Sequence, residues 1–169
     1  YFEVIADLRR RGFAVAIHDW RGQGGSYRSL KNPRKGHIND FAEYDRDLVR
    51  FMRDVVLPDC PPPYLALAHS MGGAILLRNA VEPGSWFSRM ILSAPMIALN
   101  ESKVRVPAAL VRIYAETAVT CGFASSYIQG GSDRSEETLA FEGNHLTSDR
   151  ERWARNKAVL DIAPELGLG

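Results

Sequence analysis

Hydrophobic residues recur at helical spacing at the start of the chain. Phe2, Ile5 and Leu8 fall three residues apart, which places them on one side of a helix. The spacing therefore predicts a helix over residues 1–11. The next apolar run, residues 13–18, is short, partly β-branched and followed by the glycine-rich sequence DWRGQGGS. This pattern predicts a strand that leads into a loop.

A longer helix is predicted after that loop. Asp40 and Glu43 have the spacing of a capping box, in which the first side chain binds the amide of the fourth residue. The helix that follows places its apolar residues on one face and stops at the sequence PDCPPP. The residues of that face are Phe41, Leu48, Phe51, Met52 and Val55.

Strands and helices then alternate. Residues 64–69, YLALAH, are predicted as a strand, residues 72–80 as the helix after it, and residues 89–95, RMILSAP, as the next strand. Alternation of this kind favours a parallel sheet covered by helices on both faces. We therefore expect about the first hundred residues to form the core of an α/β domain.

The alternation stops after Pro95. Residues 104–123 are apolar on nearly every side, which is typical of a buried helix or of the lining of a cavity. Ser148 and Glu151 have the spacing of a second capping box and predict a helix through Val159. The second part of the chain is therefore expected to be a helical insertion.

Composition is that of an ordinary globular protein. The 169 residues have a net charge of +1, and 46% are hydrophobic, so we expect one domain and no nucleic-acid partner. Cys60, Cys121 and the four histidines are scattered, which favours neither a disulfide framework nor a metal site. No apolar run is long enough to cross a membrane. The chain opens at Tyr1 rather than at methionine, and we expect a piece of a longer protein.

Ser70 stands between the strand at 64–69 and the helix after it, in the sequence AHSMGG. On a sharp strand-to-helix turn, a serine projects its hydroxyl clear of the backbone beside amides that favour negative charge. The motif for this nucleophile elbow is G-x-S-x-G. Ala68 replaces the first glycine and is nearly as small, and Gly72 supplies the second. The alternative is a serine that only caps the helix, and the pattern favours the elbow.

Three motifs together resemble the α/β-hydrolase family, and within it the branch of lysophospholipases and monoacylglycerol lipases. They are AHSMGG, the earlier DWRGQGGS and the later LSAP, each at the end of a predicted strand. The residues that match the branch's D-x-R-G-x-G-x-S loop are Asp19, Arg21, Gly22, Gly24 and Ser26. The sequence FEGNHLTSDRERW is similar to the cap region of bacterial lysophospholipases. The resemblance implies a partial α/β-hydrolase core at residues 1–97 and a helical cap at residues 98–169.

The glycine-rich loop has a structural interpretation. A dinucleotide fingerprint is disfavoured because Tyr27 occupies the position of its third glycine. We expect Asp19 and Arg21 to organise the loop rather than to contact substrate.

The resemblance implies an acyl-ester hydrolase that acts on monoacyl lipids through an acyl-serine intermediate. Ser70 is the expected nucleophile, and the Met71 amide the expected oxyanion donor. In the family, the acid and the histidine follow further strands after the cap, so we expect both to lie outside this chain. Asp133 and His145 follow Ser70 in the required order. No strand pattern precedes Asp133, however, and both residues fit better in the cap.

Other functions stay open at this point. The same elbow occurs in aminopeptidases and short-chain esterases, and a hydrolase-like domain can also bind lipid or a partner without turnover. Residues 104–123 suit the wall of an acyl-chain site and a plain core helix equally. The resemblance implies a lipid or ester substrate, no cofactor and no metal. We expect a cytoplasmic protein with at most peripheral membrane contact.

Overall fold

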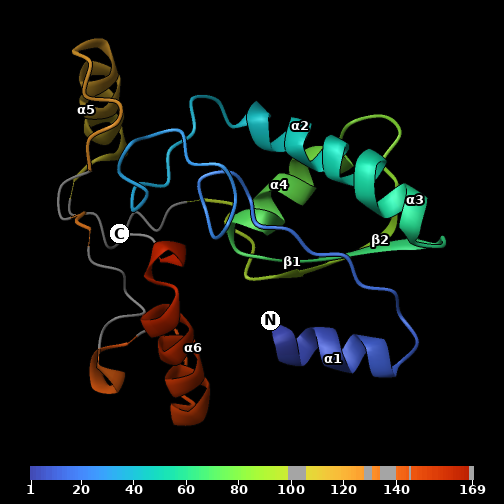
Figure 1. Cartoon of the computed structure of the whole chain (residues 1–169). Helices are drawn as coiled ribbons and strands as arrows, with labels where there is room; N and C mark the ends of the chain where they lie inside the picture. Colours follow the sequence, from blue (N-terminus) through green and yellow to red (C-terminus); the bar gives the residue numbers. More distant parts are fainter. Residues whose placement is uncertain (99–105, 128–130, 134–139, 145, 168–169) are drawn as a thin grey trace. The chain divides into compact units, whose positions relative to one another are not determined.

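The structure is a computed structural model, and its chain folds as two compact units. The first unit comprises Tyr1–His18 and Asp40–Val104, and the second comprises Asp19–Asn39 and Arg105–Gly169. The predicted boundary between core and cap stays a prediction. The structure describes residues 1–98, 106–127, 131–133, 140–144 and 146–167 (Figure 1).

The centre of the first unit is a pair of parallel strands joined by a helix. β1 (Tyr64–His69) pairs with β2 (Phe87–Ser93), with Ala66 opposite Met90. α4 (Met71–Ala80) connects the two strands and packs against both. The strands predicted at residues 64–69 and 89–95, the helix between them and the parallel pairing are confirmed. β2 begins two residues earlier than the sequence predicts.

A long helical segment packs on α4, on the side of the two strands that α4 covers (Figure 1). α2 (Ala42–Phe51) continues into the π-helical turn η1 (Met52–Val56) and then the short α3 (Leu57–Asp59). The buried residues fall four apart and are Tyr44, Leu48, Met52 and Val56. Because a π turn holds more residues than an α turn, the buried face reaches Val56, and Val55 is 41% exposed. The prediction that Val55 belongs to the apolar face is wrong.

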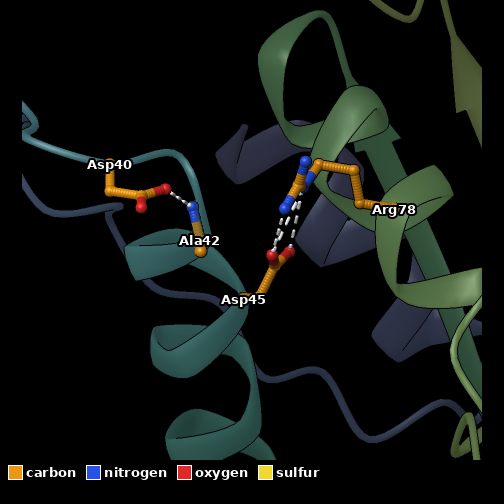
Figure 2. Close-up of polar contacts among 4 residues, drawn as sticks. All are labelled: Asp40, Ala42, Asp45 and Arg78. Carbon is orange, nitrogen blue, oxygen red and sulfur yellow. Dashed lines mark hydrogen bonds and ion pairs between the residues drawn. The ribbon is translucent and has the colours of Figure 1, made fainter.

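The start of α2 is capped differently from the predicted capping box. The Asp40 carboxylate accepts a hydrogen bond from the Ala42 amide at 2.8 Å (Figure 2). The Glu43 amide donates instead to the Asp40 carbonyl oxygen, at 2.9 Å. The helix therefore begins where expected, but Asp40 satisfies an earlier amide than the capping box requires.

An ion pair joins α2 to α4 (Figure 2). Arg78 donates from Nη2 to Asp45 Oδ2 at 2.8 Å and from Nε to the same oxygen at 3.2 Å. The guanidinium also lies over the Phe41 ring, 5.5 Å from its centroid. The hydrogen bond and charge of Asp45 raise the pKa of Arg78 above its ordinary value.

Among the described residues, only one face of the two-stranded sheet is covered. Ala66 and Leu92 lie on the face that α4 covers, and Ala66 is buried. On the other face Leu65, Leu67 and Ile91 are 46%, 53% and 65% exposed. The prediction of helices over both faces is therefore wrong for the described residues, because successive side chains of a strand alternate between its faces and only one face is buried.

The N-terminal segment forms its helix but not its strand. α1 (Phe2–Arg10) matches the predicted helix and buries no side chain. Residues 13–18 form no strand, and Phe13 and Ile17 are 45% and 58% exposed. A strand needs the hydrogen bonds of a neighbour, and among the described residues β1 and β2 pair only with each other. The prediction of a strand at residues 13–18 is thus wrong.

Two α-helices of equal length occur in the described part of the second unit. α6 (Arg150–Ile162) is capped by Asp149, whose carboxylate accepts hydrogen bonds from the amides of Glu151 and Arg152 at 2.9 and 3.1 Å. The predicted helix is confirmed, but its cap is Asp149 and not Ser148. Short 3₁₀ turns, η4 (Phe141–Gly143) and η5 (Pro164–Leu166), lie before and after it.

α5 (Ala108–Thr120) forms inside the apolar run at residues 104–123 and buries no side chain. Leu110, Ile113 and Tyr114 are 54%, 57% and 59% exposed. Arg112 and Glu116 form an ion pair at 2.8 Å on another side of the helix. The interpretation as a buried core helix is wrong, because the apolar side chains of α5 are exposed. None of the described helices has the length and apolar character needed to cross a membrane.

Candidate active site

Ser70 occupies the turn between β1 and α4 in a backbone conformation that serine rarely adopts. Its φ is 52° and its ψ is −121°. A capping serine ordinarily has an extended backbone and accepts a hydrogen bond from an amide of the first helical turn. Ser70 makes no side-chain capping bond. The simple capping alternative therefore does not fit, and the conformation has the strain expected of a nucleophile elbow.

The last residue of β2 and the short segment after it form hydrogen bonds with both main-chain groups of Ser70. The Ser70 amide donates to the Ser93 carbonyl oxygen at 3.1 Å, and the Ser70 carbonyl oxygen accepts from the Met96 amide at 3.0 Å. Ala94, between those two partners, has a φ of 42°. Sequence reasoning missed this arrangement. Its signal was the LSAP motif, which contributed to the family resemblance without receiving a structural role.

Met71 is the first residue of α4 and follows Ser70 directly. The amides of the first helical turn point out of the N-terminal end of a helix, where the helix dipole favours negative charge. The position is suitable for a donor to an oxyanion formed at Ser70. The roles of Ser70 and Met71 in catalysis stay predictions.

The glycine-rich loop of the second unit is organised by Asp19. Asp19 Oδ2 accepts a hydrogen bond from the Gly25 amide at 2.9 Å, and the Ser26 hydroxyl donates to the Asp19 carbonyl oxygen at 2.5 Å. Gly24 has a φ of 48°, and a Cβ there would lie 2.2 Å from the Asp19 carboxylate, so a side chain at this position would displace that carboxylate. Arg28 closes the loop by donating to the carbonyl oxygens of Gly22 and Gly24. The prediction that Asp19 has a structural role is confirmed.

Asp133 has partners of its own in the second unit. It accepts hydrogen bonds from the Tyr127 hydroxyl at 2.5 Å and from Asn32 Nδ2 at 2.7 Å. These bonds, that of Tyr127 first, lower the pKa of Asp133 below its ordinary value. His145 lies outside the described residues, so the alternative in which Asp133 orients His145 stays a prediction.

The remaining histidines differ in their surroundings. The His18 ring packs against Phe51, with 4.2 Å between ring centroids. His37 Nε2 lies 3.2 Å from the Asn39 side-chain oxygen, and His69 ends β1 in an exposed position. No group of acidic, histidine or cysteine residues suited to a metal ion occurs in the part of the chain that the structure describes.

Residues 1–165 match the model of the family described as serine aminopeptidase S33. The chain belongs to this family. S33 members of this kind are α/β-hydrolases, so the resemblance found in the three motifs is confirmed. The two parallel strands, α4 and the turn at Ser70 form part of that architecture.

Relatives of this chain include enzymes named for lipid substrates. Lysophospholipase L2 of Escherichia coli K12 is 35% identical over 171 residues, which cover 100% of this chain and 48% of that protein. Monoglyceride lipase of Rattus norvegicus is 35% identical over 100 residues, or 59% of this chain and 31% of that protein. Monoacylglycerol lipase of Mycolicibacterium smegmatis is 27% identical over 119 residues, or 70% of this chain and 40% of that protein. The chain spans about half the length of the Escherichia coli relative. No solved structure matches the present chain significantly.

Proposed function

We propose that the natural protein is a serine hydrolase that cleaves the acyl ester of a monoacyl lipid, a lysophospholipid or a monoacylglycerol. The observation that carries the proposal is the strained turn at Ser70, with a φ of 52° and a hydroxyl that does not cap the helix. The lipid substrate is supported by the Escherichia coli relative named lysophospholipase L2, which matches over 100% of this chain.

In the proposed reaction, Ser70 Oγ attacks the ester carbonyl carbon and gives up its proton to a histidine. The oxyanion of the tetrahedral intermediate accepts a hydrogen bond from the Met71 amide. Collapse breaks the ester bond, the glycerol oxygen leaves with the proton, and the acyl group stays on Ser70. Water then releases the fatty acid with the help of the same base. We expect this histidine and its orienting acid outside the present chain.

Residues 98–169 are proposed to be the cap, and α5 to contact the acyl chain. The support is the exposure of apolar side chains on α5, with Leu110, Ile113 and Tyr114 each more than half exposed. Such a surface suits contact with an aliphatic chain, because the contact removes the apolar surfaces of both from water. The same exposed surface is compatible with peripheral contact with a membrane that supplies the lipid.

An aminopeptidase is the second candidate, because the matched family model is described as serine aminopeptidase. This reaction would use the same serine and the same oxyanion donor, so the elbow alone does not distinguish the two. The lipid esterase is preferred because the relatives that match this chain are named lysophospholipases and monoacylglycerol lipases. Short-ester hydrolysis and binding without turnover are the remaining alternatives.

The test is to label the natural protein with a fluorophosphonate, which reacts with an activated serine. The adduct is mapped by peptide mass spectrometry. We expect it on Ser70 and expect Ser70→Ala to abolish it. Ser85→Ala is the matched control, since Ser85 precedes β2 and its hydroxyl only accepts from the Phe87 amide at 3.4 Å. Absence of labelling would favour a binding domain.

The substrate class is tested with a panel of a lysophospholipid, a monoacylglycerol, a short-chain ester and an aminoacyl anilide. Hydrolysis of a monoacyl lipid with the highest kcat/KM supports the proposal. Preference for the anilide would assign the aminopeptidase activity, and preference for the short ester would assign an esterase.

A further inference from the structure

The chain beyond β2 turns back onto the residue proposed as nucleophile. Ser93, the last residue of β2, accepts a hydrogen bond from the Ser70 amide at 3.1 Å. Three residues later, the Met96 amide donates to the Ser70 carbonyl oxygen at 3.0 Å. One short segment thus binds the amide and the carbonyl of the same residue. It can do so only if the chain changes direction between the two contacts.

Ala94 makes that change of direction at a φ of 42°. A positive φ is disfavoured in alanine because its Cβ approaches the backbone. A following proline also biases a residue toward an extended backbone of negative φ. Among the described residues, Ala94 and Ser70 are the two non-glycine residues with positive φ. The two strained residues therefore lie on either side of the same hydrogen-bonded contact.

Pro95 fixes the rest of the turn. It has no amide hydrogen, so the first donor after Ala94 is the Met96 amide, which binds Ser70. The Pro95 ring also lies against α4 at Gly73, where an added Cβ would come within 2.8 Å of it. The turn thus contacts Ser70 itself through two hydrogen bonds and the first turn of α4 through Pro95. Unusual conformations of this kind persist where the surrounding structure determines them.

We propose that Ala94 is a positioning residue for the nucleophile. Its positive φ places the Ser93 carbonyl oxygen and the Met96 amide so that they hold the Ser70 main chain in its strained conformation. Ala94 acts through Ser70 and does not touch the substrate. The catalytic part of this inference rests on the proposed function, whereas the hold on the Ser70 main chain is measurable without turnover.

The proposal predicts that tolerance of positive φ at position 94, and not side-chain size, sets the reactivity of Ser70. Glycine adopts positive φ freely, asparagine adopts it several-fold more often than other residues, and β-branched residues avoid it. Ala94→Gly and Ala94→Asn should therefore keep the wild-type rate of fluorophosphonate labelling within about threefold. Ala94→Val, close in size to asparagine, should slow it by about 10- to 100-fold, the range for a small misplacement of a reacting group.

A strained valine elsewhere in the first unit is the matched control. Gly84 has a φ of 88°, and a Cβ added there would meet no atom within 4 Å, so Gly84→Val adds the same kind of strain without a clash. It should lower the melting temperature as Ala94→Val does and leave the labelling rate unchanged. For a substrate that the natural protein hydrolyses, Ala94→Val should lower kcat with KM nearly constant, since it disturbs the nucleophile rather than binding.

Hydrogen exchange provides the readout that does not depend on catalysis. In the natural protein, the Met96 amide should be protected from exchange because it donates to Ser70. Ala94→Val should remove this protection, and Gly84→Val should keep it. If Ala94→Val is too unstable to purify, Ala94→Thr serves instead, because threonine is also β-branched and avoids positive φ.

The outcomes separate the two proposals. Equal labelling rates and equal Met96 protection in Ala94→Val and wild type would overturn the positioning role while leaving the proposed function intact. An equal loss of labelling in Gly84→Val would also overturn it, because the effect would then be general destabilisation. If wild type does not label but Ala94→Val alone loses Met96 protection, the hold on Ser70 is supported and the proposed function fails.

Discussion

Gly73 and Pro95 approach each other so closely that no side chain fits between them. A Cβ on Gly73 would lie 2.8 Å from the Cβ and 3.0 Å from the Cα of Pro95. Gly73 belongs to the first turn of α4, which begins directly after Ser70. Alanine is the better helix former by about 1 kcal/mol, but forcing an extra methyl into a packed contact costs about 1–3 kcal/mol. We expect Gly73→Ala to reduce the free energy of unfolding by up to about 2 kcal/mol, measured by urea denaturation.

Gly143 offers the control for this prediction. It lies in η4, and a Cβ there meets no atom within 4 Å. Gly143→Ala should change the free energy of unfolding by less than about 0.5 kcal/mol. A Gly73→Ala protein as stable as wild type would mean that Pro95 moves aside at little cost.

Two neighbouring valines test the face that the π turn buries. Val56 is 9% exposed and Val55 is 41% exposed. Removing two methyl groups from a buried site costs about 1.5–3 kcal/mol of unfolding free energy, because the transfer energy is lost and a cavity remains. We therefore expect that loss for Val56→Ala and about 0.5 kcal/mol or less for Val55→Ala. Equal losses in denaturant unfolding would contradict the π turn.

The sequence could predict those parts of the fold that neighbouring residues determine. β1, α4 and β2 follow one another closely, and each has an apolar pattern of its own. Residues 13–18 have a similar pattern, but whether they form a strand depends on a partner elsewhere in the chain. Val55 was assigned to the buried face because the pattern was extended at a period of 3.6 residues, and the π turn changes that period at Met52.

The candidate site was likewise predictable only where neighbouring residues determine it. The small residues around Ser70 indicate a tight turn, because larger neighbours would clash in it. The role of Ala94 was not predictable, since its positive φ comes from contacts with a turn that lies 24 residues earlier in the sequence. The apolar composition of α5 indicated a helix but not its burial, because the same residues suit a core, a ligand site or an exposed face.

Asp149 is expected to stabilise α6, and its contribution should depend on pH. The hydrogen bonds from the amides of Arg152 and Glu151 lower the pKa of Asp149 below its ordinary value of 3.8. A carboxylate with a lowered pKa in the folded state stabilises the protein fully above the unfolded value. This contribution should therefore begin to disappear as the pH falls below about 3.8 and be absent below the folded pKa.

The measurement is the melting temperature of the Asp149→Ala and Ser148→Ala variants between pH 2 and pH 7, a range set by that pKa. Asp149→Ala should melt earlier at neutral pH, and its difference from wild type should shrink at the acid end. Ser148→Ala should follow wild type throughout, because Ser148 is not the cap. A larger effect of Ser148→Ala would restore the capping box that the sequence alone suggested.

Asp133 and Tyr127 test whether the second unit contains a catalytic acid. The hydrogen bond to Asp133 raises the pKa of Tyr127 above its ordinary value of 10.0, and burial adds to the rise. Asp133→Asn removes the carboxylate charge, so the Tyr127 pKa should fall back toward 10.0. NMR titration of the tyrosine ring carbon resolves this shift. Asp149→Asn is the matched control and should leave the Tyr127 pKa unchanged.

The same variant separates the two assignments of the acid. If Asp133 only accepts bonds from Tyr127 and Asn32, Asp133→Asn should leave the fluorophosphonate labelling rate of Ser70 unchanged. Replacing the acid of a serine–histidine–acid triad by its amide lowers the rate by about four orders of magnitude, because the histidine takes the wrong tautomer. A loss of that size in Asp133→Asn would assign Asp133 as the acid and make His145 the candidate base. Unchanged labelling would support an acid outside this chain.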